Sequence, residues 1–247
     1  ATPPVDPTRK PFMLAGLAVN MEQPIHPLFR YLYVADKYEG LIITDATSML
    51  NGNPTDNFLK REVCFNPDNI LYDAKHIHIV GHYAYISCAA GLVVVDINDP
   101  KNPKVTSIVG EKHLKHPHMV ATQFRYAYVA DEEGIKVLDI TDLSKPVPKS
   151  AIKIPDAHSI YLGRTYAYVA AKQRGLVILD ITHAEEPKVD QVYNAGGHIN
   201  DAHDVKLAVT YNSVFAYIAD GKNGMRVVQL SSPETPGYEG FAFRPTP

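Results

Sequence analysis

The sequence predicts an all-β protein, a β-propeller of four-stranded antiparallel blades, and three observations support this fold class. A phrase close to Tyr-Ala-Tyr-Val-Ala, followed by a glycine and an apolar run, occurs five times. The glycine stands at positions 40, 91, 134, 175 and 224, and repeats of roughly 40–50 residues made of short strands are typical of propellers. The apolar runs are short and bounded by Gly, Asp, Asn and Pro, which favours strands over helices.

Each repeat divides into four strands, and the fourth repeat shows this most clearly. Its predicted strands are, in order, Ser159–Leu162, Tyr166–Ala170, Leu176–Ile181 and Lys188–Tyr193. The glycine before the third strand supplies a backbone angle that a tight hairpin requires. The third strand is almost continuously apolar, as expected for a strand covered on both faces. The predicted blades are 26–70, 71–112, 113–155, 156–196 and 197–247.

The two ends of the chain extend this pattern. Residues 1–25 form an N-terminal segment in which Phe12–Val19 is predicted to be the orphan outer strand of a preceding blade. Because a lone edge strand would be exposed, we favour a complete propeller of six or seven blades, with the missing segments supplied upstream or by a partner chain. The alternative is that the orphan strand packs on the propeller without belonging to a full blade. Tyr238–Phe243 is the predicted outer strand of the last repeat.

The composition fits one large all-β domain and argues against several function classes. The 247 residues are 45% hydrophobic with a net charge of -3 and no basic run, so nucleic acid is not an expected partner. No apolar stretch reaches the length of a membrane span. No CxxC motif occurs, and whether Cys64 and Cys88 are bridged or free stays open. No catalytic triad, phosphate loop or carboxylate pair stands out, and no catalytic residue is predicted.

A histidine recurs just before or at the start of the first strand of every repeat. Because the first strand of a blade lines the central channel, these histidines are expected to form a ring near one mouth of it. Converging neutral imidazoles are what copper, zinc or iron ligation requires, and neighbouring polar side chains would fix the ring tautomers. The alternatives are a substrate site or a turn device repeated in each blade. The candidate metal ligands are His26, His76, His118, His158 and His203, with His78, His116, His198, Asp156, Asp201 and Asp204 as their neighbours.

Other repeated residues have structural interpretations. An aspartate that follows the second strand is expected to form an Asx turn, and an aspartate that ends the third strand is expected to cap the next turn. The first tyrosine of each phrase is expected to pack between blades. The turn residues are Asp36, Asp131, Asp220, Asp96, Asp139 and Asp180, and the tyrosines are Tyr31, Tyr83, Tyr126 and Tyr166.

The phrases Gly-Leu-Val-Val-Val-Asp-Ile at 91–97 and Gly-Leu-Val-Ile-Leu-Asp-Ile at 175–181, each preceded by Tyr-Ala-Tyr, resemble the LVIVD repeat family over residues 26–243. That resemblance implies a propeller that is exported to the periplasm or the cell surface. Some members are joined to, or encoded beside, multihaem cytochromes, which implies a redox protein as partner. More locally, Asp201-Ala-His-Asp-Val is similar to turns of the selenium-binding protein and methanethiol oxidase family, whose histidines hold copper.

These patterns lead to one functional expectation and two alternatives. We expect a non-catalytic scaffold or protein-interaction module of an exported complex, whose partner is a multihaem cytochrome or the remainder of a larger propeller. The first alternative is a copper-type oxidoreductase that uses the histidine ring. In the second, one of the histidines contacts a haem held by another chain.

Overall fold

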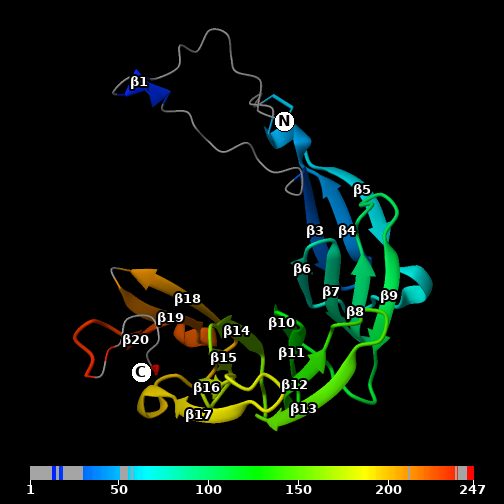
Figure 1. Cartoon of the computed structure of the whole chain (residues 1–247). Coiled ribbons are helices and arrows are strands. Elements are labelled where there is room, and N and C mark those ends of the chain that lie inside the picture. Colours follow the sequence, from blue (N-terminus) through cyan, green and yellow to red (C-terminus); the bar gives the residue numbers. More distant parts are fainter. Residues whose placement is uncertain are drawn as a thin grey trace.

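A computed structural model describes residues 13–14, 17–18, 30–50, 55–56, 58–210, 212–236, 238 and 244–247. Residues 30–247 of this set form five antiparallel sheets of three or four strands that follow one another along the chain (Figure 1), and a separate two-stranded pair lies in the N-terminal segment. In each sheet, strands that are consecutive in the sequence are hydrogen-bonded neighbours. The fold class predicted from the sequence, an all-β propeller of antiparallel blades, is therefore confirmed.

The second, third and fourth sheets have four strands each. The second sheet comprises β6 (His76–Val80), β7 (Tyr83–Cys88), β8 (Gly91–Asp96) and β9 (Lys104–Val109). The third comprises β10 (Met119–Gln123), β11 (Tyr126–Asp131), β12 (Gly134–Asp139) and β13 (Val147–Lys153). The fourth comprises β14 (Ser159–Gly163), β15 (Tyr166–Ala170), β16 (Leu176–Asp180) and β17 (Lys188–Tyr193).

The first and fifth sheets show three strands among the described residues. The first comprises β3 (Tyr31–Asp36), β4 (Gly40–Asp45) and β5 (Lys60–Phe65), and the fifth comprises β18 (Asp204–Thr210), β19 (Ser213–Ala219) and β20 (Met225–Ser231). The first-strand position of the first repeat lies outside the described residues, as does most of the predicted outer strand Tyr238–Phe243. Beside β20, the Thr246 N–H donates to the Leu230 carbonyl at 2.7 Å.

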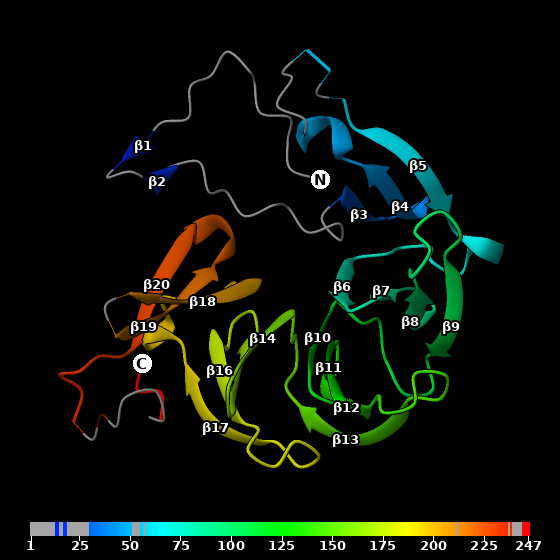
Figure 2. The ribbon, with the colours of Figure 1, turned by 45° about the horizontal axis from the view of Figure 1, so that its top comes forward.

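The five sheets are arranged as an arc (Figure 2). Strands β6, β10, β14 and β18 lie on the inner side of the arc, and β9, β13 and β17 lie on its outer side. The inner strands of neighbouring sheets contact one another. The first and fifth sheets lie at the two ends of the arc.

Each sheet has two faces, which we call the forward face, directed at the next sheet, and the backward face, directed at the preceding one. The second tyrosine of the repeated phrase lies on the forward face. The alanine directly before it and the β-branched residue directly after it lie on the backward face, because side chains alternate along a strand. Tyr128, for example, shares a core cluster with Ala167 and Val169 of the next sheet, and Tyr168 shares one with Ala216 and Ile218.

The first tyrosine of each phrase was expected to pack between blades, and the structure shows that the second tyrosine is the more buried of the two in the second, third and fourth sheets. The first tyrosine of each phrase, such as Tyr83 or Tyr126, is half-buried at the margin of a sheet interface. The second tyrosine is the buried one, and Tyr85, Tyr128 and Tyr168 are almost completely covered. Both tyrosines lie on the forward face, because side chains two residues apart in a strand share a face. They differ in burial because the second tyrosine lies near the middle of the strand and the first lies at its start.

The repeated glycine has a physical role at the hairpin between the second and third strands. Gly134 has a φ of +148°, and a Cβ there would lie 2.0 Å from the Ile152 carbonyl oxygen of the outer strand β13. Gly91 meets the Val109 carbonyl oxygen in the same way. At Gly224 of the fifth sheet, no heavy atom of the described residues lies within 4 Å of such a Cβ. In the second and third sheets, the glycine therefore allows the outer strand to approach.

Five of the six aspartates accept N–H groups of the turn that follows them, as the sequence predicted, and Asp220 does not. Its carboxylate instead accepts from the N–H groups of Asn200 and Asp201, which lie before β18, so the predicted Asx turn at this position is wrong. Asp131 accepts hydrogen bonds from the N–H groups of Glu133 and Gly134, and Asp139 accepts one from the Thr141 N–H. Both cysteines are free: Cys64 is exposed on β5, and Cys88 is buried at the end of β7.

The N-terminal segment pairs differently from the expectation. Within Phe12–Val19, the structure describes two short strands, β1 (Met13–Leu14) and β2 (Leu17–Ala18), which form an antiparallel pair with each other. This stretch therefore folds back on itself and does not run as one strand. Its assignment to a preceding blade stays a prediction. Among the described residues, no helix is long and apolar enough to span a membrane.

Candidate functional site

The histidines of the third, fourth and fifth repeats occupy one equivalent position. Each of these histidines donates its backbone N–H to an alanine carbonyl of the second strand of its own sheet. The pairs are His118 with Ala130 at 2.8 Å, His158 with Ala170 at 2.9 Å and His203 with Ala219 at 2.8 Å. In the second repeat Lys75 makes this bond, to the Ser87 carbonyl at 2.8 Å. His76 therefore stands one residue beyond the shared position, and a lysine replaces the imidazole expected there.

This repeated turn uses only the backbone, as Lys75 demonstrates. A turn device therefore does not explain why histidine recurs in the other repeats. The imidazoles instead contact one another across the sheet boundaries. The rings of His118 and His158 are stacked, with centroids 4.6 Å apart and planes 7° apart, and the rings of His158 and His203 meet edge to face at 5.1 Å. We call these three residues the histidine row.

The rings of the histidine row lie stacked or edge to face. Imidazole nitrogens bind metals through lone pairs in the ring plane, and stacked parallel rings do not direct those lone pairs at one point. Among the residues that the structure describes, no group of three or more His, Cys, Asp or Glu side chains is placed to hold a metal ion. His26 lies outside the described residues. The copper, zinc or iron site therefore stays a prediction.

His158 and His118 are electrically neutral near neutral pH. Burial, together with the charges of His118, Lys172 and His203, lowers the pKa of His158 to about 4. Burial also lowers the pKa of His118, with an added contribution from Lys75. Because neutral rings can stack without charge repulsion, the low pKa values and the stacked geometry agree with each other.

His76 has a different role at the boundary between the second and third sheets. Its Nδ1 accepts a hydrogen bond from the Val120 N–H at 3.5 Å, and burial lowers its pKa to about 4. Two residues further along β6, His78 lies 3.0 Å from the Thr122 hydroxyl through its Nε2. Both histidines therefore join β6 to β10 and do not contribute to the row.

A polar cluster lies at the end of the row. The Lys172 ammonium lies 2.8 Å from His203 Nε2 and 3.3 Å from the Asp201 carboxylate, which is itself 3.1 Å from His203. Sequence analysis named Asp201 as a neighbour of the row but missed Lys172, which lies in the hairpin after β15. Only the folded hairpin brings it there, so no spacing in the sequence could have identified it.

The remaining predicted neighbours lie elsewhere. His116 pairs with Glu132 at 3.1 Å, and Asp204 pairs with Lys206 at 2.9 Å. Asp156 acts on His158 only through its charge. His198 follows the short helix η4 (Ala195–Gly197).

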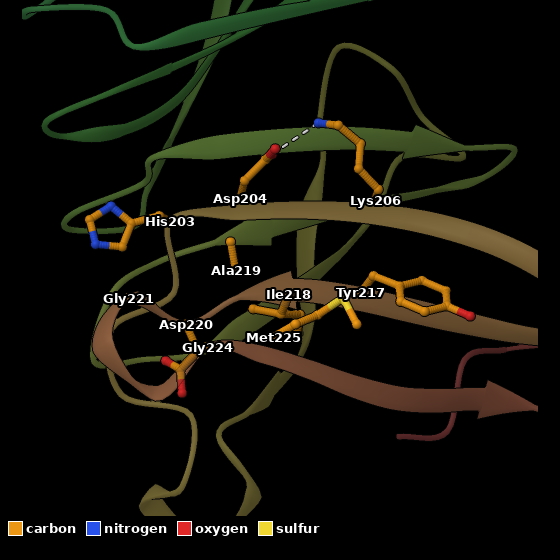
Figure 3. Close-up of a pocket in the computed structure, with 10 residues that line it drawn as sticks. All are labelled: His203, Asp204, Lys206, Tyr217, Ile218, Ala219, Asp220, Gly221, Gly224 and Met225. Carbon is orange, nitrogen blue, oxygen red and sulfur yellow. Dashed lines mark hydrogen bonds and ion pairs between the residues drawn. The ribbon is translucent and has the colours of Figure 1, made fainter.

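The forward face of the fifth sheet is the second candidate site. We call it the open face, and it comprises Lys206, Ala208, Phe215, Tyr217, Met225 and Val227, which share one side of β18, β19 and β20. A pocket of about 560 Å³ overlaps part of this face, at Lys206, Tyr217 and Met225 (Figure 3). The pocket is lined by His203, Asp204, Lys206, Tyr217, Ile218, Ala219, Asp220, Gly221, Gly224 and Met225.

Exposure separates the open face from the forward faces of the other sheets. Val227 is 51% exposed, whereas the residues in the same register of the other four sheets are 0% exposed. Those counterparts are Ile43, Val94, Val137 and Ile178. Tyr217 is half-buried, although its counterparts in the second, third and fourth sheets are fully buried.

Five sheets that share one register, stacked face to face around an arc, define a repeat protein of the propeller class. The LVIVD repeat family model matches residues 30–63, 73–110, 120–152, 156–193 and 201–240. The chain therefore belongs to the LVIVD repeat family. Among curated proteins, none matches the chain.

Solved structures share the fold at low sequence identity. A protein from Lactobacillus plantarum is 14% identical with a TM-score of 0.58, over 82% of this chain and 67% of that one. The computationally designed Ika8 protein is 11% identical with a TM-score of 0.56, over 81% of this chain and 55% of Ika8. The extracellular domain of the hybrid two-component system BT3049 from B. thetaiotaomicron is 14% identical with a TM-score of 0.54, over 83% of this chain and 25% of that one.

Proposed function

We propose that this propeller is a non-catalytic protein-interaction module of an exported or cell-surface complex, and that it binds its partner through the open face. The observation that carries the proposal is the 51% exposure of Val227, where four counterparts are fully buried. An apolar surface of this kind on a folded protein is typical of an interaction site. The extracellular domain among the structural neighbours supports the proposed location.

A multihaem cytochrome is the partner class to test first, because such proteins accompany some LVIVD members. The test is to isolate the tagged chain with its native partners and to record metal content and the visible spectrum. The matched variant is Val227→Asp, which places a charge on the open face without touching a buried residue. We expect a partner to co-purify with the native chain and to be lost with the variant, and a haem spectrum in the first sample would identify the partner as redox-active.

The same samples decide the copper-type alternative. A transition metal near one equivalent per chain, lost in the double variant His118→Ala and His158→Ala, would replace the interaction module with a metalloprotein. A partner that remains bound to the Val227→Asp chain would remove the open face as the site of interaction.

A further inference from the structure

We propose that the open face binds one further β-sheet of the same repeat type, carried by another polypeptide, in the register that joins the five sheets of this chain. This inference deepens the proposed function by naming the kind of partner. It rests on the continuity of the open face with the four sheet interfaces inside the molecule, and on two polar side chains at its inner edge.

The apolar part of the open face repeats what the buried forward faces carry. In the third sheet, Tyr128 and Val137 are fully buried against the fourth sheet. Tyr217 and Val227 stand in the same cross-strand pair on β19 and β20. A face with the same Tyr–Val pair at its centre is complementary to the same kind of neighbour, namely a sheet.

The neighbour is defined by what the buried tyrosines meet. Tyr85, Tyr128 and Tyr168 each share a cluster with an alanine of the next sheet, Ala127, Ala167 and Ala216 respectively. Each of these alanines is fully buried and is followed two residues later by a valine or isoleucine that is also fully buried. The partner sheet is therefore expected to carry Ala and then Val or Ile at these positions of its second strand.

The first sheet of this chain does not meet that rule. Leu32 occupies the alanine position and is 44% exposed, and Val34 follows it and is 46% exposed. Opposite Tyr217, a leucine would occupy the space that alanine leaves free in the other interfaces, and overpacked interfaces are costly. The first sheet is therefore a poor match for the open face, both within this molecule and in a second copy of it.

The inner strand β18 adds polar recognition. In two interfaces, a side chain at the start of the inner strand accepts the N–H of the next inner strand: His76 accepts from Val120 at 3.5 Å, and Ser159 accepts from Val205 at 3.1 Å. Asp204 stands in this register on β18. Its Oδ1 accepts from the Val205 N–H at 2.8 Å and from the Lys206 ammonium at 2.9 Å, and the second oxygen of the carboxylate is an acceptor for the equivalent N–H of an arriving strand.

Lys206 makes the recognition specific to the fifth sheet. It corresponds to His78, which reaches Thr122 of the next inner strand at 3.0 Å. Ala121 and Tyr161 hold this register in the third and fourth sheets, so only β18 places a cation there among these four inner strands. The partner sheet is therefore expected to carry an oxygen acceptor, a hydroxyl or carboxylate, opposite Lys206.

The experiment measures how accessible the open face is. Val227→Cys is introduced in a chain that also carries Cys64→Ser, because Cys64 is the exposed native thiol, and the rate of modification by a small thiol reagent is recorded. A second chain is extended after Pro247 by a copy of residues 113–155, which contains Thr122 and Ala127. A third chain carries Ala127→Lys in the added copy only.

We expect rapid modification in the unextended chain, about tenfold slower modification in the extended chain because the added sheet covers position 227, and rapid modification again when the copy carries Ala127→Lys. An extended chain that reacts as fast as the unextended one overturns the proposal, whether the copy is folded or not, because a receptive face would order it. If the chain with the Ala127→Lys copy protects position 227 as well as the chain with the native copy, the proposal is also overturned. The added segment would then cover the face without packing in the register of the other sheets.

The thiol-modification assay, run on the unextended chain at several protein concentrations, tests the other two occupants. Protection of position 227 that grows with protein concentration would show that a second copy covers the open face. Protection that does not depend on concentration would show that this chain covers its own face. Either result overturns the proposal. If the native partner is lost with Val227→Asp but the added copy is not accepted, the proposed function stands and only the partner class fails.

Discussion

On the third sheet, Tyr128 and Val137 are fully buried against the fourth sheet, whereas on the fifth sheet Tyr217 and Val227 hold the same register beside solvent. The two strand pairs carry almost the same sequence, and their backbones pair in the same way. The difference between them therefore comes from the neighbour and not from the repeat itself. A repeated sequence specifies the surface of a blade, and position in the array decides whether that surface is core or interface.

The largest effect is expected at the hairpin glycines. Gly134→Ala places a Cβ against the Ile152 carbonyl oxygen of the outer strand, and because backbone must move to relieve it, we expect a loss of about 4 kcal/mol in the free energy of unfolding. At Gly224→Ala, no heavy atom of the described residues lies within 4 Å of the added Cβ, and the φ of +77° is unfavourable, which costs about 1–3 kcal/mol. Chemical denaturation of both variants measures the difference, and equal losses would contradict the comparison.

Truncation of the matched β-branched residues tests burial directly. Ile178 is 0% exposed, and Ile178→Ala is expected to cost about 2–5 kcal/mol through lost burial and a residual cavity. Val227→Ala on the open face is expected to change the free energy of unfolding by about 0.5 kcal/mol or less. A large loss at position 227 in the isolated chain would mean that the open face is already covered.

Acidification tests the histidines at the sheet boundaries. The folded chain holds the pKa values of His76 and His158 at about 4, below the value of about 6.5 in an unfolded chain. The unfolded state therefore binds more protons, and the free energy of unfolding falls as the pH falls from about 6.5 toward about 4. Because His158 is partly open to solvent, we expect only about 1 kcal/mol over this range.

The control for this pH dependence is His158→Gln, which cannot take up a proton. Its free energy of unfolding is expected to fall less steeply over the same range. An unchanged slope would show that the histidine row does not titrate in this way.

The smallest effect is expected at the ion pairs. Lys206 pairs with Asp204 at 2.9 Å on the exposed edge of β18, and Lys206→Ala is expected to cost about 0.5 kcal/mol or less. Lys136 on β12 is a more enclosed lysine. Its side chain forms ion pairs with Asp131, at the end of β11, and with Glu133 in the hairpin. Lys136→Ala is expected to cost more than Lys206→Ala when both are measured by thermal unfolding. The reverse order would contradict this ranking of the two ion pairs.

The fold could be predicted from the sequence because each signal is local. The glycine interval, the alternation of Tyr166–Ala170 and the aspartates that accept turn N–H groups depend on residues close together in the chain. The site could be predicted only in part, because it depends on contacts between repeats. The sequence places His118 and His158 in one register, but the stacking of their rings depends on how two sheets pack.

The sequence did not show that His76 lies one residue beyond the position that His118 occupies in the next repeat. His76 and His118 look equivalent by eye, yet strand pairing places Lys75 at the histidine position of the second repeat. Lys172 reaches His203 through a hairpin of the preceding sheet, so no spacing indicates their contact. The exposure of Val227 likewise depends on whether another sheet packs on the forward face, and the repeat pattern alone does not predict this.

The face-to-face stacking of the sheets also determines how the molecule comes apart. Each inner sheet is held by two interfaces and each end sheet by one, as in a linear array whose stability is a sum of nearest-neighbour contributions. Such arrays fray from their ends, so the amide protons of β19 should exchange by opening events of lower free energy than those of β11, although both are second strands of their sheets. A partner sheet on the open face would turn the fifth sheet into an inner one. Binding would then be recorded as slower opening at a terminus, without any change in the shape of the chain.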